Sequence, residues 1–445
     1  MRKLFVIVGL LLLAGAGFLL MRRERTDWTA ASSEARREFI EGLEAELKFY
    51  REDALAHYTK ALELDPQMPM AALRLLDATP LKEKAEIARR LDDLKALRLA
   101  VGDRMTARER MLMDYRLQRA AKENARAEKT LAAYLEEHPN DPWALSIRCD
   151  QAWQRRDLAA TEDCNRRLIK ADPNWVQAQN QLGYIAMAQG RFAEAEQLFR
   201  TYLYIAPDQA NPHDSMGELF TVLGRYAESE RELEEAIRIR PSFCASWEHL
   251  VLLHDVSGAP EKARAALARL RELGACSKDL IERQECRVGT WEGVLRNDPA
   301  AAWEKASTLG CAGRGGEISV LAYHAALRSG HDADAALLEA DVREHARLYG
   351  DDEPALQAMV DHLEGARLAV AGDARAAAAR FASADAGLLY WGDNLGLMKL
   401  FNRLELARTL RLAGDPAKAD AMLGEVKAVN ADFAQRFADA SFFAP

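Results

Sequence analysis

Two histidines near the middle of the chain are its best candidates for metal chemistry. His249 follows Glu248 directly, and His254 comes five residues after His249. Two zinc ligands on one face of a helix are normally four residues apart, because about four residues complete a helical turn. The spacing of five therefore disfavours a zinc site, and we expect His254 to be an ordinary packing residue.

Nucleotide binding and nucleophilic catalysis lack the residues that they require. The glycines between Gly310 and Gly316 are not followed by the Lys-Ser/Thr pair of a phosphate-binding loop, so we expect a flexible joint there. The sequence has no G-x-S-x-G motif and no convincing cysteine–histidine pair for nucleophilic catalysis. Paired carboxylates such as Glu234 and Glu235 are usually solvated on helix surfaces. We therefore expect no enzyme activity, no cofactor and no metal site.

The six cysteines are spaced in a way that permits three local disulfides. The three pairs would be Cys149 with Cys164, Cys244 with Cys276, and Cys286 with Cys311. Each pair would join neighbouring helices, and disulfides are typical of oxidising compartments. The same cysteines could instead be small buried hydrophobic residues. A zinc site is the least favoured alternative, because no C-x-x-C or H-x-x-x-H spacing is present.

The elements that must position these residues are helices. The chain of 445 residues is 49% hydrophobic and exceeds the usual size of one globular domain. Ala, Leu, Arg and Glu dominate, and most of the 14 prolines fall where helical patterns stop, so we expect no long strands. A net charge of -9 gives no electrostatic reason to bind nucleic acid or an anionic bilayer. We expect an all-α protein that does not bind nucleic acid.

An apolar segment near the N-terminus is typical of a membrane anchor. Residues 4–21 form 18 uncharged residues between the basic pair Arg2 and Lys3 and the basic residue Arg22. Small residues at 14–16 could form a signal-peptidase site, but the apolar stretch continues beyond them, which favours an uncleaved transmembrane helix. No cysteine lies nearby, which excludes a lipoprotein. Basic residues flank both ends, so charge alone does not decide the orientation.

A repeat of 34 residues runs through the middle of the chain. The positions Gly183, Gly190, Phe199 and Pro207 recur 34 residues later as Gly217, Gly224, Leu233 and Pro241. The pattern predicts two amphipathic helices per repeat: Gly183 allows their close approach, Gly190 ends the first helix, and proline stops the second. One such hairpin cannot bury its apolar face alone, so we expect the hairpins to stack into a solenoid.

These residues and their spacing resemble the tetratricopeptide-repeat family, most strongly from Met111 to Leu270. The resemblance implies a right-handed superhelix of helix-turn-helix units. Weaker copies lie on both flanks, at 42–66 and around Gly330, Gly372 and Gly414, while the pattern slips between Pro299 and Gly316. We therefore expect a transmembrane segment at 1–26, a repeat-like unit with connecting helices at 27–107, a core array at 108–277 and a degenerate array at 278–445.

A narrower resemblance concerns the compartment. Residues 102–110 and 207–215 resemble stretches in the extracytoplasmic repeat regions of bacterial membrane-bound transcriptional regulators and serine/threonine kinases. Those proteins carry a cytoplasmic output domain before the membrane segment, whereas this chain has only a two-residue basic stub there. The resemblance implies a single-pass protein of the bacterial inner membrane with a periplasmic body, whose signals would pass through another protein.

In the tetratricopeptide-repeat family the first helix of each unit lines a concave groove. Carrying the groove positions onto this chain gives Trp143, Asp150, Trp153, Gln177, Asn180, Tyr184, Asn211, Asp214, Glu218, Glu248 and Asp255. The resemblance implies that the tryptophans stack apolar or cationic side chains and that the acids pair with Lys or Arg. Alternatively, the charged residues are merely solvated and Trp143 staples its helix. Five further tryptophans are expected in the core, namely Trp175, Trp247, Trp291, Trp303 and Trp391.

The function implied by this resemblance is binding rather than catalysis. We expect a scaffold or adaptor that is tethered through residues 4–21, binds proteins or peptides through its concave surface, and organises an envelope protein complex. The alternative is a sensory or regulatory subunit whose repeats bind a peptide or ligand and signal through a separate output protein.

Overall fold

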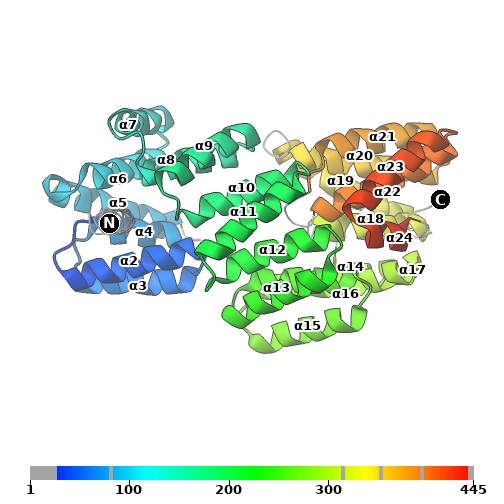
Figure 1. Cartoon of the computed structure of the whole chain (residues 1–445), viewed down its shortest axis with the longest axis horizontal. Helices are drawn as coiled ribbons and strands as arrows, with labels where there is room; N and C mark the ends of the chain where they lie inside the picture. The colour runs from blue at the N-terminus through cyan, green and yellow to red at the C-terminus, as the bar shows by residue number, and fades with distance from the viewer. Residues whose placement is uncertain (1–27, 80–83, 312–315, 350–353, 391–394, 439–445) are drawn as a thin grey trace, which may run out of the picture. The chain divides into compact units, whose positions relative to one another are not determined.

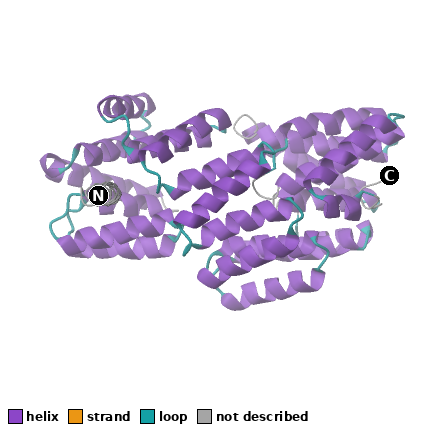
Figure 2. Ribbon diagram, viewed as in Figure 1, coloured by secondary structure: helices purple, strands orange, loops and turns teal. Residues whose placement is uncertain are grey.

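The computed structural model describes residues 28–79, 84–311, 316–349, 354–390 and 395–438. All regular secondary structure within these ranges is helical, as the composition predicted (Figure 2). The expected membrane segment at 4–21 lies outside the described residues. Among the helices that are described, none is both long enough and apolar enough to cross a bilayer.

The chain divides into two compact units. The first consists of Met1–Gln151 and Arg167–Pro173, and the second of Ala152–Arg166 and Asn174–Pro445. The division falls within α8 (Pro142–Gln154) and α9 (Leu158–Ala171). This point lies inside the stretch 108–277 that the sequence suggested as one continuous array.

The first unit begins with a helical hairpin that matches the weak repeat expected at 42–66. Its helices are α2 (Ser33–Leu47), α3 (Arg51–Leu64), α4 (Pro69–Ala78), α5 (Lys84–Val101), the short 3-10 helix η1 (Gly102–Arg104), α6 (Ala107–Ala120) and α7 (Asn124–Glu137) (Figure 1). A Cβ atom on Gly42 would lie 2.5 Å from the ring of Tyr58, so only glycine allows α2 and α3 to approach this closely. The sequence pattern therefore identified a true hairpin here.

The second unit contains the hairpins that the 34-residue period predicts. They are α10 (Val176–Ala188) with α11 (Phe192–Ile205), α12 (Ala210–Val222) with α13 (Tyr226–Ile239), and α14 (Cys244–Val256) with α15 (Pro260–Leu273) (Figure 1). Gly190, Gly224 and Gly258 have φ values of 73°, 71° and 74° and end the first helix of each pair, as expected. A Cβ atom on Gly183 would lie 2.3 Å from the ring of Phe199, which confirms the predicted close approach.

Ion pairs between successive repeats follow the same period. Arg191 contacts Glu162 of the preceding repeat at 2.8 Å, and Arg225 contacts Glu196 at 2.6 Å. Both members of the pair recur 34 residues later, so one interaction is used twice along the array. Isolated surface pairs of this kind contribute about 0–1 kcal/mol each, so apolar stacking remains the main source of stability.

The C-terminal part of the second unit continues the helical pairs. Its helices are α16 (Lys278–Leu295), α17 (Pro299–Thr308), α18 (Gly316–Arg328), α19 (Asp332–Tyr349), α20 (Pro354–Val370), α21 (Ala374–Gly387), α22 (Leu395–Leu412), α23 (Pro416–Val429) and α24 (Ala431–Phe437). Gly330, Gly372 and Gly414 again have positive φ at the turns, as the weaker copies predicted. The stretch from Pro299, where the repeat pattern slips, begins with α17, and most of the joint expected at Gly310–Gly316 lies outside the described residues.

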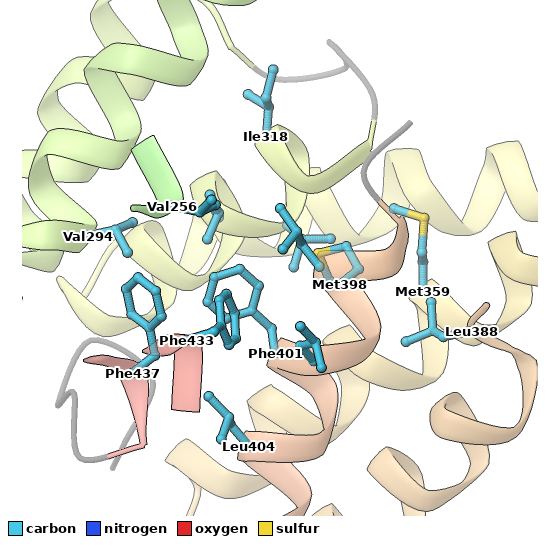
Figure 3. Close-up of a cluster of buried hydrophobic side chains, with 14 of the residues drawn as sticks. Val256, Val294, Ile318, Met359, Leu388, Met398, Phe401, Leu404, Phe433 and Phe437 are labelled. Carbon is cyan, nitrogen blue, oxygen red and sulfur yellow. The ribbon is translucent and has the colours of Figure 1, made fainter. Parts of the chain in front are cut away.

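The last helices fold back against the first repeats of the same unit. One hydrophobic core contains Val222 and Val256 from the ends of α12 and α14 together with Phe401, Phe433 and Phe437 from α22 and α24. Figure 3 shows Val256 and Val294 on the same side of the cluster as Phe433 and Phe437. These contacts join residues roughly two hundred positions apart, as the hydrogen bond from Asn430 to Thr221 illustrates with a separation of 209. The second unit is therefore closed on itself.

Two disulfides of the second unit each join a helix to a nearby loop, not two helices as expected, because Cys276 lies between α15 and α16 and Cys311 follows α17. Cys244 is bonded to Cys276 and Cys286 to Cys311, which are two of the pairings that the spacing permits. Cys149 and Cys164 are also disulfide-bonded.

Most of the tryptophans expected in the core are buried. Trp175, Trp247 and Trp291 are 6%, 3% and 0% exposed, and Trp303 packs against the core while partly buried. Trp391 lies outside the described residues.

Candidate functional site

Most of the predicted groove residues lie on three adjacent helices of the second unit. These helices are α10, α12 and α14, and they carry Gln177, Asn180, Tyr184, Asn211, Asp214, Glu218, Glu248 and Asp255. Helix α12 contacts both α10 and α14, so the structure brings this part of the predicted set onto one surface. The 34-residue period produces this arrangement because it places equivalent positions of successive first helices next to each other.

A row of polar contacts crosses these helices from one repeat to the next. The Tyr184 hydroxyl on α10 donates to Glu218 Oε2 on α12 at 2.8 Å. Asp214 Oδ1 on α12 lies 3.0 Å from His249 Nδ1 on α14. Arg287 Nη1 on α16 lies 3.5 Å from Glu248 Oε1 on α14. We call these side chains the inner polar row, which consists of Tyr184, Asp214, Glu218, Glu248, His249 and Arg287.

The charges of the inner polar row are set by these contacts. Burial would lower the pKa of His249, but the charge of Asp214 and the hydrogen bond to it outweigh burial and raise this pKa to about 10. Burial opposes ionisation of Glu248, yet Arg287 and His249 lower its pKa overall. The cations His249 and Arg287 therefore lie beside the carboxylates of Asp214 and Glu248 within the row.

The inner surface is only partly open. Asn180, Asn211, Asp214 and Asp255 are 8%, 8%, 3% and 0% exposed, so these four groove positions are buried. Part of the cover comes from the C-terminal region of the same unit. Tyr390, Gly396 and Leu397 close over Met187, Glu218, Val222, His249 and Leu252 around a cavity of about 10 Å³, at the lower limit for one water molecule.

Four members of the inner polar row remain partly exposed. They are Tyr184, Glu218, Glu248 and His249. Gln177, near the start of α10, is also partly exposed. These side chains offer an aromatic face, two carboxylates, an imidazolium and an amide to a partner, whereas no catalytic arrangement is formed by them.

The tryptophans expected at one end of the groove belong to different units. Trp143 lies in the first unit, where its indole meets Trp28 edge to face at 5.4 Å and Arg74 lies 5.0 Å from its ring. This packing favours the alternative, structural role of Trp143 over a role in an open binding site. Asp150 in the same unit is exposed, and Trp153 in the second unit is partly buried.

Two members of the inner polar row, His249 and Arg287, were not predicted from the sequence. His249 lies beside the groove position Glu248, and its separation of 35 from Asp214 could have suggested the contact. Arg287 is harder to find, because it lies 39 residues after Glu248. Helix α16 has 18 residues where α14 has 13, so the partner on α16 is displaced from the 34-residue step.

One group of possible metal ligands is found among the described residues. Glu38 and Glu41 on α2 and His57 on α3 have ligand atoms within 4.8 Å of one another. His57 Nδ1 already lies 2.9 Å from Glu38 Oε2, and Glu41 is exposed. A histidine–carboxylate hydrogen bond at the surface accounts for this geometry.

Comparison with known proteins identifies the repeat. Residues 176–209, which contain α10 and α11, match the tetratricopeptide repeat family. No curated protein matches the sequence.

Several solved structures are similar in fold at low sequence identity. The APC/C hetero-tetramer Cut9-Hcn1 is 14% identical, with a TM-score of 0.48 over 97% of this chain and 82% of that chain. The human IFIT1 dimer with m7Gppp-AAAA is 12% identical, with a TM-score of 0.42 over 90% and 91%. A tetratricopeptide repeat protein from Parabacteroides merdae is 14% identical, with a TM-score of 0.38 over 65% and 98%.

Proposed function

Because the chain carries tetratricopeptide repeats, we propose that it is a protein-interaction scaffold that binds a segment of a partner polypeptide along the inner polar row. The tether is residues 4–21 in the bacterial inner membrane, and the repeats lie in the periplasm, where the scaffold organises an envelope protein complex. Catalysis has no part in this function.

The observation that carries this proposal is the composition of the exposed part of the row. Glu218 and Glu248 are partly exposed carboxylates on adjacent repeats, and the Tyr184 hydroxyl donates to Glu218. A partner segment with Lys or Arg would meet these two carboxylates, and Tyr184 offers an aromatic surface beside them. The row therefore favours a basic peptide over an acidic one.

Partner capture tests the proposed binding surface. Full-length tethered protein would be compared with a Glu218→Gln/Glu248→Gln variant, because glutamine keeps hydrogen-bonding capacity towards Tyr184 and Arg287 while removing the charge. Asp214 stays unchanged, since it is buried against His249. The matched control is Glu194→Gln/Glu228→Gln, which removes two charges of the second helices α11 and α13.

We expect the control to retain a specific partner and the inner-row variant to lose it, with both folded by circular dichroism. Equal recovery of partners by the two variants would show that the inner polar row is not the binding surface. Failure of all forms to capture any protein would contradict the scaffold function itself.

The proposed compartment rests on the apolar stretch at 4–21 and on the disulfides, which persist in oxidising compartments. Protease added to spheroplasts should degrade the repeats, whereas the same protease added to intact cells should not. Removal of residues 4–21 should release the protein from alkali-washed membranes. Protection in spheroplasts would place the body in the cytoplasm instead.

A further inference from the structure

The closure of the second unit uses three equivalent turns of the array. The backbone N–H of Tyr390 donates to Ala188 O at 3.4 Å, next to Gly190. The side-chain amide of Asn430 donates to Val222 O at 3.1 Å, and a Cβ atom on Gly224 would lie 2.3 Å from Asn430 Oδ1.

At the third turn, a Cβ atom on Gly258 would lie 2.4 Å from Arg436 Nη1. Each turn glycine, 34 residues from the next, thus receives one side chain from the C-terminal region.

Helix α22 holds α24 in this position through a partly buried arginine. Arg408 on α22 donates to the carbonyl oxygens of Phe437 and Ala438 at the end of α24, the latter at 3.0 Å. The same guanidinium pairs with Glu405, whose side chain is 1% exposed. Any loosening of α22 therefore removes the contact that fixes the end of α24.

A chain of buried polar side chains links α22 to two other helices. His324 Nε2 on α18 lies 3.0 Å from His362 Nε2 on α20, and His362 Nδ1 lies 2.9 Å from Asn402 Oδ1 on α22. Asn402 Nδ2 donates to Phe381 O at 2.9 Å, so Asn402 Oδ1 is left to accept from His362 Nδ1. His362 Nε2 is then the acceptor for the proton on His324 Nε2, and both imidazoles are neutral.

The surroundings of the two histidines disfavour a positive charge. His324 and His362 are 0% and 1% exposed. Burial lowers the pKa of His362 to about 4, and burial together with His362, Arg328 and Arg408 lowers the pKa of His324 well below its usual value.

The charged groups on the neighbouring helices explain why a positive charge on the two histidines is disfavoured. Helix α18 contributes Arg328, and helix α22 contributes Arg408 and Glu405, whose pKa burial raises. Asp361 on α20 is engaged by Arg380 and Ser383 instead. Helix α21 presents the ring of Phe381 to His362, and Tyr323 on α18 donates to Leu363 O. A new imidazolium on His324 would therefore be repelled by the guanidinium groups of Arg328 and Arg408.

We propose that the closure of the second unit is acid-labile: proton uptake by the His324–His362 pair loosens α22 and releases α24 from the turns at Gly224 and Gly258. At neutral pH the pair is uncharged and the unit stays closed. Acidification opens it and uncovers the apolar ends of α12 and α14 that α22 and α24 bury.

A distance measurement on the full chain tests this inference. All six native cysteines are in disulfides, so Ala265→Cys on α15 and Gln435→Cys on α24, both exposed positions, would be the only reactive thiols for spin labels. We expect one short distance at about pH 7.5 and a longer second population at about pH 5. With a pKa of about 4 when closed and about 6.5 when open, His362 alone shifts the opening equilibrium about 30-fold at pH 5.

Two variants separate the histidine pair from other acid effects. His362→Gln removes the titrating group while its amide can still donate to Asn402, and it should abolish most of the shift. His57→Gln in the first unit is the control and should leave the shift intact. The inference is overturned if the longer population fails to appear in the native chain, or if it appears equally in folded His362→Gln protein.

Discussion

Replacement of Gly224 by alanine should destabilise the second unit far more than the same replacement at Gly414, where a Cβ atom would meet no other atom within 4 Å. Gly224 has a φ of 71°, a conformation that costs an alanine about 1–2 kcal/mol. In addition, the new Cβ atom would lie 2.3 Å from Asn430 Oδ1 and would displace a side chain that is fully buried. The carbonyl of Val222 would then lose its bond from Asn430, at about 1–3 kcal/mol for an unsatisfied buried group. The expected total is about 2–5 kcal/mol.

Gly414 provides the matched control for the backbone cost. Its φ is 87°, and a Cβ atom there would meet no other atom within 4 Å. Gly414→Ala should therefore cost only the conformational term of about 1–2 kcal/mol. Urea unfolding followed by circular dichroism measures both free energies of unfolding, and the difference between the two variants reports the contact with Asn430.

A double-mutant cycle decides whether Asn430 is the cause. If Asn430→Ala is already present, Gly224→Ala should add only the backbone cost, because no amide remains to be displaced. Equal costs of Gly224→Ala and Gly414→Ala in the native background would refute the reasoning, as would strict additivity in the cycle. Either result would mean that the C-terminal helices do not bind this turn in solution.

The other predictions concern buried charges. The pKa of His362 is lowered in the folded state, so the unfolded chain binds more protons below about pH 6.5. The free energy of unfolding, measured by urea unfolding, should therefore fall by about 2 kcal/mol between pH 7 and pH 5. The His362→Gln variant should lose most of this pH dependence. The substitution Asp214→Ala should lower the free energy of unfolding by about 1.5–3 kcal/mol. It should also return the pKa of His249, measured by NMR titration, from about 10 to its usual value or below. An unchanged pKa of His249 would contradict the cause assigned to it.

The repeats could be predicted because their determinants are local. Gly183 meets Phe199 within one hairpin, and Gly190 ends one helix, so each role is visible within a single 34-residue period. Helix α17 was missed although a local signal was present. Asp298 caps its first turn by accepting from Ala301 N, and Pro299 occupies the first position, which is a recognised helix start.

The closure could not be predicted from the sequence. Tyr390, Asn430 and Arg436 meet the array across about two hundred residues, and nothing in their own neighbourhoods specifies that contact. For the same reason the groove prediction, which placed Asp214 and Glu218 together on one surface, did not foresee that Tyr390 and Leu397 would cover part of it.

Closure changes what the turn glycines do in this chain. In an open array such a glycine only ends a helix, and the last hairpin leaves an apolar face without a neighbour. Here the absence of a side chain at Gly224 and Gly258 also makes room for Asn430 and Arg436, so one residue type ends the helix and accepts the returning chain. The apolar ends of the first helices are thereby buried within the unit, whereas four side chains of the inner polar row, which we propose as the binding surface, stay partly exposed.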